Sequence, residues 1–325
     1  MPSRQVNRKT VAIVAAVFFL IAIVWLWRDP MLMVRGAFAA QRWWIGLSSQ
    51  QVEAGGHRWA YAEREAVKPD APTLVMVHGF TGSKENWYPM AERLGGHYRL
   101  IVPDLPGWGA SERKDGEDYG FNAQSARLAE FVEKIRKPGS DVVLLGHSMG
   151  GGIVAVTAAD HPGEIARVGL FDAAGVRFKD NRFGKQVLAG ENPFAVHDDA
   201  SLKRYFDTVF HDAEAKPSLP WPISRALVGW RTRQAPFEQS VLDRIGRSDE
   251  SFLPGKAASA IGQPALLLWC RQDAVIDPSA MALYAERMPH ALQVMLDGCG
   301  HMSIMEKPDD AAAAVELLIK RGAPR

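Results

Sequence analysis

A G-x-S-x-G pattern centred on Ser148 spans residues 146–150 and is the segment of this chain best suited to do chemistry. An apolar β-type run at 141–145 precedes it, and a small-residue helical pattern at 151–159 follows it. A strand, a sharp turn and a helix in this order hold the serine in a strained backbone and lift its hydroxyl above the sheet edge. The pattern therefore predicts that Ser148 is a nucleophile.

The same segment also comes near the dinucleotide-binding pattern G-x-G-x-x-G, with Asp172 as a ribose ligand at the end of the next expected strand. Two features disfavour this alternative. Ser148 occupies the position where a glycine must let pyrophosphate approach, and the segment lies far into the chain rather than in a first βαβ unit. We therefore favour the hydrolase hypothesis.

A nucleophilic serine needs a base, and the base needs an acid that orients it. In a strand–helix fold with this turn, the expected chain order is serine, acid, histidine. Asp273 and His301 each follow the end of an expected strand, so their side chains should meet Ser148 at one edge of the sheet. We predict that Ser148, Asp273 and His301 form a catalytic triad.

Other histidines and aspartates also lie near strand ends. His147 is adjacent to Ser148 on a tight turn, where neighbouring side chains diverge, so it is expected to orient the turn. His78 is expected to belong to the loop that stabilises negative charge. Asp277 and Asp172 remain alternatives to Asp273 as the acid.

Acyl transfer puts negative charge on the carbonyl oxygen, and backbone N–H groups must already point at it. Met149, which follows the nucleophile, is expected to supply one N–H group. Phe80 is the best candidate for the second, because Gly79 lets the loop after the strand at 73–77 bend without a Cβ clash.

Strand-like and helix-like patterns alternate along most of the chain after residue 50. This rhythm predicts the α/β class, with a mainly parallel sheet and helices on both faces. The expected strands lie at 52–61 (as a hairpin), 73–77, 98–102, 141–145, 168–171, 265–269 and 292–296.

The alternation stops between residues 175 and 256, where aromatic residues and prolines are frequent and no β-type run occurs. An insertion this long between two strands is interpreted as a cap or lid over the active site. The alternative is a helical subdomain that only stabilises the sheet. The expected α/β-hydrolase core then comprises residues 51–174 and 257–325.

Residues 1–50 form a separate unit. The uncharged apolar run 11–27, preceded by Arg4, Arg8 and Lys9, predicts a retained transmembrane anchor with the rest of the chain on the far side of the membrane. A cleaved signal peptide is the alternative. Residues 31–47 predict an amphipathic juxtamembrane helix that lies on lipid, supports a homodimer, or packs on the catalytic domain.

Composition limits the remaining classes. The chain has 325 residues, 47% hydrophobic and 23% charged, with a formal net charge of +1, so no nucleic-acid partner is implied. Cys270 and Cys299 are expected to be buried free thiols, and a bridge between them is the less favoured alternative.

From about residue 72 onward the chain resembles α/β-hydrolase-fold serine hydrolases. The matching landmarks are His78-Gly79-Phe80, the segment 104–111, the segment 146–151, Gln272-Asp273 and Gly300-His301. The segments 269–273 and 297–308 resemble those of membrane-anchored monoacylglycerol lipases, and bacterial inner-membrane phospholipase A and esterase relatives share the N-terminal anchor plan.

The resemblance implies hydrolysis of acyl esters of lipids without a metal or organic cofactor, at the periplasmic side of an inner membrane. It carries the triad onto Ser148, Asp273 and His301, and the oxyanion hole onto Phe80 and Met149. The insertion matches no motif, so chain length and head group are not implied. A general carboxylesterase for small esters, a non-lipid α/β hydrolase and a non-catalytic membrane-tethered binding protein are the alternatives.

Overall fold

The computed structural model describes residues 28–321. The apolar run at 11–27, predicted to be a transmembrane anchor, lies outside these residues. Among the helices between residues 28 and 321, none combines the length and the apolar character needed to cross a membrane.

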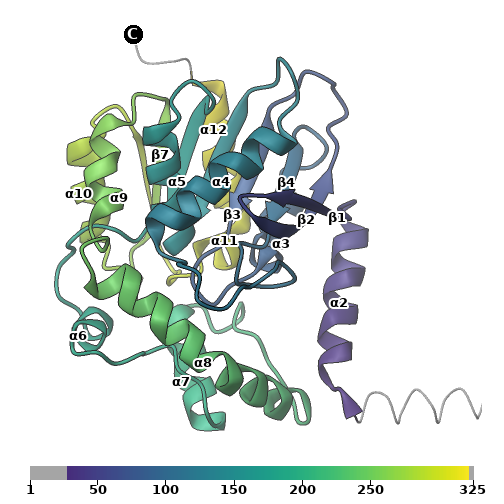
Figure 1. Ribbon diagram of the computed structural model, residues 1–325, viewed down its shortest axis with the longest axis vertical. Helices are drawn as coiled ribbons and strands as arrows, with labels where there is room; N and C mark the ends of the chain where they lie inside the picture. Colours follow the sequence, from purple (N-terminus) through teal and green to yellow (C-terminus); the bar gives the residue numbers. More distant parts are fainter. Residues whose placement is uncertain (1–27, 322–325) are drawn as a thin grey trace, which may run out of the picture.

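The centre of the molecule is one eight-stranded sheet with the order β1-β2-β4-β3-β5-β6-β7-β8 (Figure 1). The strands are β1 (Ser48–Ala54), β2 (His57–Arg64), β3 (Thr73–Val77), β4 (Arg99–Pro103), β5 (Val142–His147), β6 (Arg167–Phe171), β7 (Ala265–Cys270) and β8 (Leu292–Leu296). All pairs from β4 to β8 are parallel, and only β1–β2 and β2–β4 are antiparallel. The predicted mainly parallel sheet is confirmed.

Local sequence explains the strands. β3 and β5 are buried along their whole length, which is why they read as unbroken apolar runs rather than as alternating patterns. The β1–β2 hairpin turns at Gly55 and Gly56, whose φ angles of 55° and 72° suit glycine in a two-residue turn.

Helices cover both faces of the sheet. One face carries α4 (Phe121–Ile135), α5 (Met149–Asp160) and α10 (Ser279–Arg287), and the other carries α3 (Tyr88–Arg93) and α12 (Pro308–Lys320). In α4 the buried residues Leu128, Phe131, Val132 and Ile135 recur at helical spacing, so one stripe of the helix packs on the sheet.

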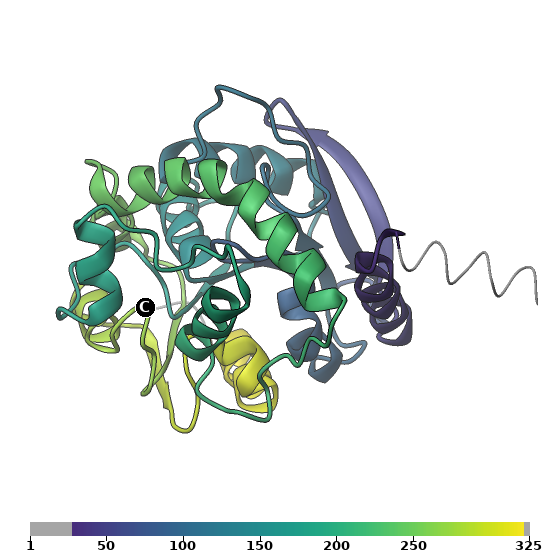
Figure 2. The same ribbon diagram turned by 90° about the horizontal axis from the view of Figure 1, so that it is seen from below.

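The segment between β6 and β7 contains α6 (Arg182–Leu188), α7 (Asp199–Val209), α8 (Ile223–Arg247) and α9 (Leu253–Ala257). Its residues 175–256 are called the helical insertion, and α9 ends one residue beyond them. α7 begins with a capping box between Asp198 and Ser201. Helices α6, α7 and α8 gather on one side of the sheet, and α8 crosses that side obliquely (Figures 1 and 2).

The predicted juxtamembrane helix is present as α2 (Met31–Trp44). The helix ends at Trp44, before the predicted end at residue 47, and Ile45 is 6% exposed and packs in the core with Leu47, in agreement with the alternative that this segment packs on the catalytic domain. The chain turns at Gly46, with φ of 74°, and this turn directs Ile45 and Leu47 toward the sheet. The α2 tryptophans, by contrast, remain outside the core.

Candidate active site

Ser148 lies on the sharp turn between β5 and α5. Its φ of 56° and ψ of −121° are unusual for a residue with a side chain, as the G-x-S-x-G pattern predicts. The backbone packs so closely there that a Cβ on Gly146 would lie 2.3 Å from the carbonyl oxygen of Gly150. This crowding explains the flanking glycines and aims the serine hydroxyl outward at the carboxyl edge of the sheet.

The structure brings Ser148, His301 and Asp273 into one hydrogen-bonded chain. His301 Nε2 lies 2.9 Å from Ser148 Oγ, and His301 Nδ1 lies 2.9 Å from Asp273 Oδ2. All three residues are buried. This arrangement activates a serine hydroxyl, because the base contacts the nucleophile and the acid contacts the base.

The surroundings set the proton affinities of the acid and the base. Burial lowers the pKa of His301 to about 3, so the imidazole is neutral near pH 7 and able to accept a proton. Burial raises the pKa of the Asp273 carboxyl. The N–H groups of Val275 and Ile276 donate to Asp273 Oδ1 at 2.7 and 3.0 Å and oppose that rise by stabilising the carboxylate.

Two backbone N–H groups, those of Phe80 and Met149, belong to residues that line a cavity together with Ser148. Within residues 28–321 neither N–H group donates to a protein acceptor. The loop that carries Phe80 lies directly against the nucleophile, since a Cβ on Gly79 would lie 2.8 Å from Ser148 Cβ. These two groups can donate hydrogen bonds to the oxyanion of a tetrahedral intermediate, and one such donor is worth on the order of 3 kcal/mol.

A family model described as the alpha/beta hydrolase fold matches residues 72–308. The chain belongs to the alpha/beta hydrolase fold family. The resemblance seen in the sequence is therefore confirmed, and the dinucleotide-binding alternative is wrong.

Similar proteins narrow the class of this hydrolase. Lipase 3 of Moraxella sp. (strain TA144) is 30% identical over 262 residues, which are 80% of each chain. Monoacylglycerol lipase ABHD6 of Bos taurus is 25% identical over 293 residues, covering 88% of this chain and 86% of that protein. The crystal structure of a bacterial membrane phospholipase A, 27% identical, has a TM-score of 0.83 and covers 97% of this chain and 98% of its own. This hydrolase is a carboxylic ester hydrolase.

The other histidines have structural partners. His147 Nε2 donates to the carbonyl oxygen of His301 at 2.6 Å, so His147 contacts the histidine loop and does more than orient its own turn. His78 Nδ1 donates to Gly79 O at 2.8 Å, and its Nε2 accepts from Leu105 N–H at 3.0 Å. Both rings are oriented by these bonds.

The alternative acids make other contacts. Asp172 is fully buried, accepts from Cys270 N–H at 3.0 Å and from the Ser303 hydroxyl, and has a pKa raised by burial. Asp277 accepts from Ser279 N–H at the start of α10. Only Asp273, of these three carboxyl groups, hydrogen-bonds to His301 in the hydrolase.

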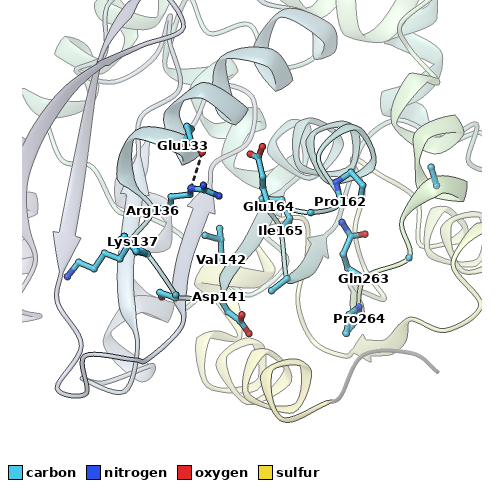
Figure 3. A pocket seen from close by; sticks show the side chains of 17 residues that line it. Glu133, Arg136, Lys137, Asp141, Val142, Pro162, Glu164, Ile165, Gln263 and Pro264 are labelled. Carbon is cyan, nitrogen blue, oxygen red and sulfur yellow. Dashed lines mark ion pairs between the residues drawn. The ribbon is translucent and has the colours of Figure 1, made fainter.

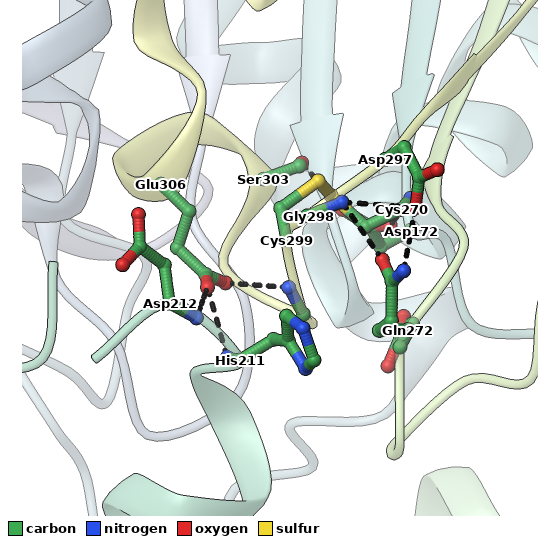
Figure 4. The surroundings of a disulfide bond; sticks show 12 residues. Asp172, His211, Asp212, Cys270, Gln272, Asp297, Gly298, Cys299, Ser303 and Glu306 are labelled. Carbon is green, nitrogen blue, oxygen red and sulfur yellow. Dashed lines mark hydrogen bonds between the residues drawn. A yellow bond between two sulfur atoms is a disulfide. The ribbon is translucent and has the colours of Figure 1, made fainter. Parts of the chain in front are cut away.

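The expectation that Cys270 and Cys299 are free thiols is wrong: they form a disulfide (Figure 4). β7 and β8 are parallel neighbours, and Cys270 is paired with Leu296, so the loop after β8 brings Cys299 beside the end of β7. The disulfide joins the loops that carry Asp273 and His301.

Glu306 is a site-adjacent residue that the sequence reasoning missed. Its carboxylate is buried, and it accepts from the N–H groups of Gly300 at 2.9 Å, His211 at 2.8 Å and Asp212 at 2.7 Å (Figure 4). No sequence motif or hydrophobic periodicity could reveal these hydrogen bonds, because two of the donors lie more than 90 residues away in the helical insertion.

An apolar cavity of about 110 Å³ opens beside Ser148, between the sheet edge and the helical insertion. Its apolar lining comes from α6, α8 and neighbouring loops, and includes Phe80, Val176, Phe183, Val187, Phe194, Leu242, Ile245, Phe252, Val275 and Ile276. This lining suits an apolar ligand group.

A second hollow, of about 890 Å³, lies at the opposite edge of the sheet (Figure 3). It is bordered by residues that begin strands, such as Asp141, Val142 and Pro264, and by Glu133 and Arg136 from the end of α4. Ser148 does not line this hollow, so the hollow is separate from the candidate active site.

Proposed function

We propose that this protein is a serine hydrolase that cleaves acyl esters of lipids, such as monoacylglycerols, lysophospholipids or phospholipids. The observation that carries the proposal is the chain of 2.9 Å contacts from Ser148 through His301 to Asp273 at the mouth of an apolar cavity. The names of the similar proteins, lipases and a membrane phospholipase A, support a lipid substrate.

In the proposed first step, Ser148 Oγ attacks the ester carbonyl carbon while His301 Nε2 takes the hydroxyl proton. The N–H groups of Phe80 and Met149 hydrogen-bond to the oxyanion. Asp273 holds the His301 tautomer and stabilises the imidazolium. The C–O bond then breaks, and His301 gives its proton to the departing alcohol.

The second step releases the fatty acid. His301 takes a proton from a water molecule, and the hydroxide attacks the acyl-Ser148 ester. Collapse of the second tetrahedral intermediate breaks the bond to Ser148 Oγ, which recovers its proton from His301. The apolar lining of the cavity, with Phe183 and Leu242 among its members, would bind the acyl chain during both steps.

We further propose that the helical insertion acts as a cap, with residues 51–174 and 257–325 as the catalytic core. Four cavity-lining residues, Phe183, Val187, Leu242 and Ile245, come from helices α6 and α8 of that insertion. The alternative of a purely stabilising subdomain does not explain why these side chains surround the cavity.

The membrane part of the proposal has three supports. The apolar run 11–27 directly precedes the described chain, and such a run can anchor a protein in a bilayer. The Cys270–Cys299 disulfide fits an oxidising compartment such as a periplasm. Together with the basic residues ahead of the run, they favour a catalytic part outside the cytoplasm.

The experiment is a substrate panel on the full chain and on Ser148→Ala. Purified protein is assayed with monoacylglycerols, lysophospholipids, phospholipids and short p-nitrophenyl esters, and both proteins are treated with a fluorophosphonate probe. We expect the probe to label only the protein with Ser148, and long-chain lipid esters to be preferred. A folded Ser148→Ala variant with full activity would contradict the proposed mechanism. A preference of the wild-type protein for short esters would favour a general carboxylesterase.

A further inference from the structure

Exposed large apolar side chains are concentrated on two segments of this protein, α2 and residues 221–230. Within residues 28–321, eleven large hydrophobic residues are exposed, and seven of them lie on these segments. They are Leu32, Met33, Phe38, Trp43, Trp44, Trp221 and Trp230. We call these seven residues the α2–α8 face.

The sequence of both segments makes this exposure unusual. Residues 221–230 read Trp-Pro-Ile-Ser-Arg-Ala-Leu-Val-Gly-Trp, and none of the ten is buried by the rest of the described chain. None of the α2 residues is buried either. Trp43 and Trp44 are 78% and 75% exposed, and Trp221 is 66% exposed. Exposed apolar groups gathered on neighbouring elements are typical of interaction sites.

The two segments lie side by side although about 180 residues separate them. α2 contacts α8, and both views place α2 beside the end of α8 where that helix begins (Figures 1 and 2). The face therefore joins the helix at the start of the described chain to the helical insertion that lines the cavity.

The charge on these segments is positive. Residues 28–44 contain Arg28, Arg35 and Arg42 against one acid, Asp29, and residues 221–230 contain Arg225 and no acid. Tryptophan and arginine together suit the boundary between lipid head groups and hydrocarbon, and arginines near an anionic leaflet add attraction.

We propose that the α2–α8 face lies on an anionic lipid bilayer. The sequence favours a bilayer as the partner of this face, because the apolar run 11–27 comes shortly before α2, which begins at Met31. The face holds the helical insertion, and with it the substrate cavity, against the bilayer from which the lipid ester comes. This inference rests on the proposed lipid substrate and adds the surface that presents the site to it.

The test uses the full chain reconstituted in vesicles of phosphatidylcholine and phosphatidylglycerol. Trp221→Ser/Trp230→Ser is compared with Val67→Ser/Leu317→Ser, in which two exposed apolar residues outside the face are replaced. Each protein is assayed with a vesicle-embedded lipid ester and with water-soluble p-nitrophenyl butyrate. We expect the first variant to lose about tenfold in rate on vesicles, equivalent to roughly 1.4 kcal/mol of interfacial binding, and to keep its rate on the soluble ester. The control should keep both rates.

Fluorescence quenching by brominated phosphatidylcholine gives a second readout. Wild-type emission should fall by a larger fraction than that of the first variant, because Trp221 and Trp230 reach the lipid. Trp221→Ser alone, at a site 66% exposed, serves if the double variant does not fold.

Three outcomes overturn the proposal. The first is an equal rate on vesicles for the two variants, and the second is a parallel loss of the vesicle and soluble-ester activities in the first variant. The third is a shift of the first variant from dimer to monomer with an unchanged rate on vesicles, which would assign the face to contact with a second copy of the chain. If the wild type does not hydrolyse p-nitrophenyl butyrate at all, that result would instead contradict the proposed function on which this inference rests.

Discussion

Glu306 accepts a 2.9 Å hydrogen bond from the backbone N–H of Gly300, the residue that precedes His301. Its other carboxylate oxygen accepts from His211 and Asp212, which follow α7 in the helical insertion. One buried side chain thus joins the loop of the proposed base to the insertion. The Met302 N–H, which donates to Val209 O at 3.2 Å, adds a second link between the same two segments.

We predict that Glu306→Gln lowers kcat by about tenfold with little change in KM for a soluble ester, because the amide cannot accept all three N–H bonds and the His301 loop loses its position. An N–H left unpaired in a buried site costs roughly 1–3 kcal/mol. The negative charge of Glu306 also raises the pKa of His301. Removing it should lower that pKa and move the acid limb of the kcat/KM profile to lower pH.

The matched control is Glu316→Gln, which removes a partly exposed acid on α12 that pairs with Lys320 at 3.7 Å. It should leave kcat and the pH profile unchanged. If Glu306→Gln lowers thermal stability yet shifts neither kcat nor the acid limb, Glu306 is structural only.

The pH profile of the wild-type enzyme is the second prediction. His301 acts as a base only when neutral, and burial keeps its pKa below the ordinary value of 6.5. Activity is therefore present above the His301 pKa and is lost as the pH falls through it. We expect the acid limb of kcat/KM for p-nitrophenyl butyrate to have an apparent pKa below 6.5, and a limb above 7 would contradict the stated effect of burial.

Much of this architecture could be predicted from local signals. β3 and β5 are recognisable because strands buried on both faces read as apolar runs, and the turn at Ser148 is recognisable because its glycines are required sterically. Their chain order and their positions after expected strands then placed Asp273 and His301 at the edge where the structure finds them. The roles of these residues remain predictions that kinetics must test.

What the sequence left open depends on contacts between distant segments. The Cys270–Cys299 bond requires knowing that β7 and β8 are neighbours, and the role of Glu306 requires knowing where the insertion folds back. The position of Ile45 depended on a turn at Gly46 that an amphipathic pattern cannot reveal. Periodicity reports which face of an element is apolar, but not which partner covers it.

The third prediction separates the candidate acids. Asp273→Asn should lower kcat by roughly 10⁴-fold, since an amide favours the wrong His301 tautomer and cannot stabilise the imidazolium. Asp277→Asn, four residues along the same loop, should leave kcat within a factor of about two, because the Asp277 carboxylate accepts from Ser279 N–H and Asp273 is the carboxylate bonded to His301. Single-turnover assays with a chromogenic ester measure both, and equal effects would remove the basis for assigning Asp273.

The fourth prediction concerns the disulfide. Cys270→Ala/Cys299→Ala opens a covalent loop with a sequence separation of 29, which in the chain-entropy account costs about 3–4 kcal/mol in the free energy of unfolding. We expect a lower Tm in the double variant than in the oxidised wild type. Treating the wild type with dithiothreitol should lower its Tm similarly, whereas dithiothreitol should not change the variant. A Tm unaffected in both cases would show that the bond does not contribute to stability.

The last prediction concerns acyl-chain length. Gly246 on α8 lines the cavity, and a Cβ there would lie 2.7 Å from Val187 Cγ1, so a larger side chain must displace the α6 wall or fill the cavity. Gly246→Val should lower kcat/KM for p-nitrophenyl decanoate by about tenfold or more and leave p-nitrophenyl acetate nearly unchanged, because only the longer chain reaches this part of the lining. Gly229→Val is the matched control on the same helix, where a Cβ meets only the end of Arg233 at 3.6 Å. Both variants carry the same change in helix propensity, so equal loss of activity on the two esters in Gly246→Val would argue against this cavity as the acyl site.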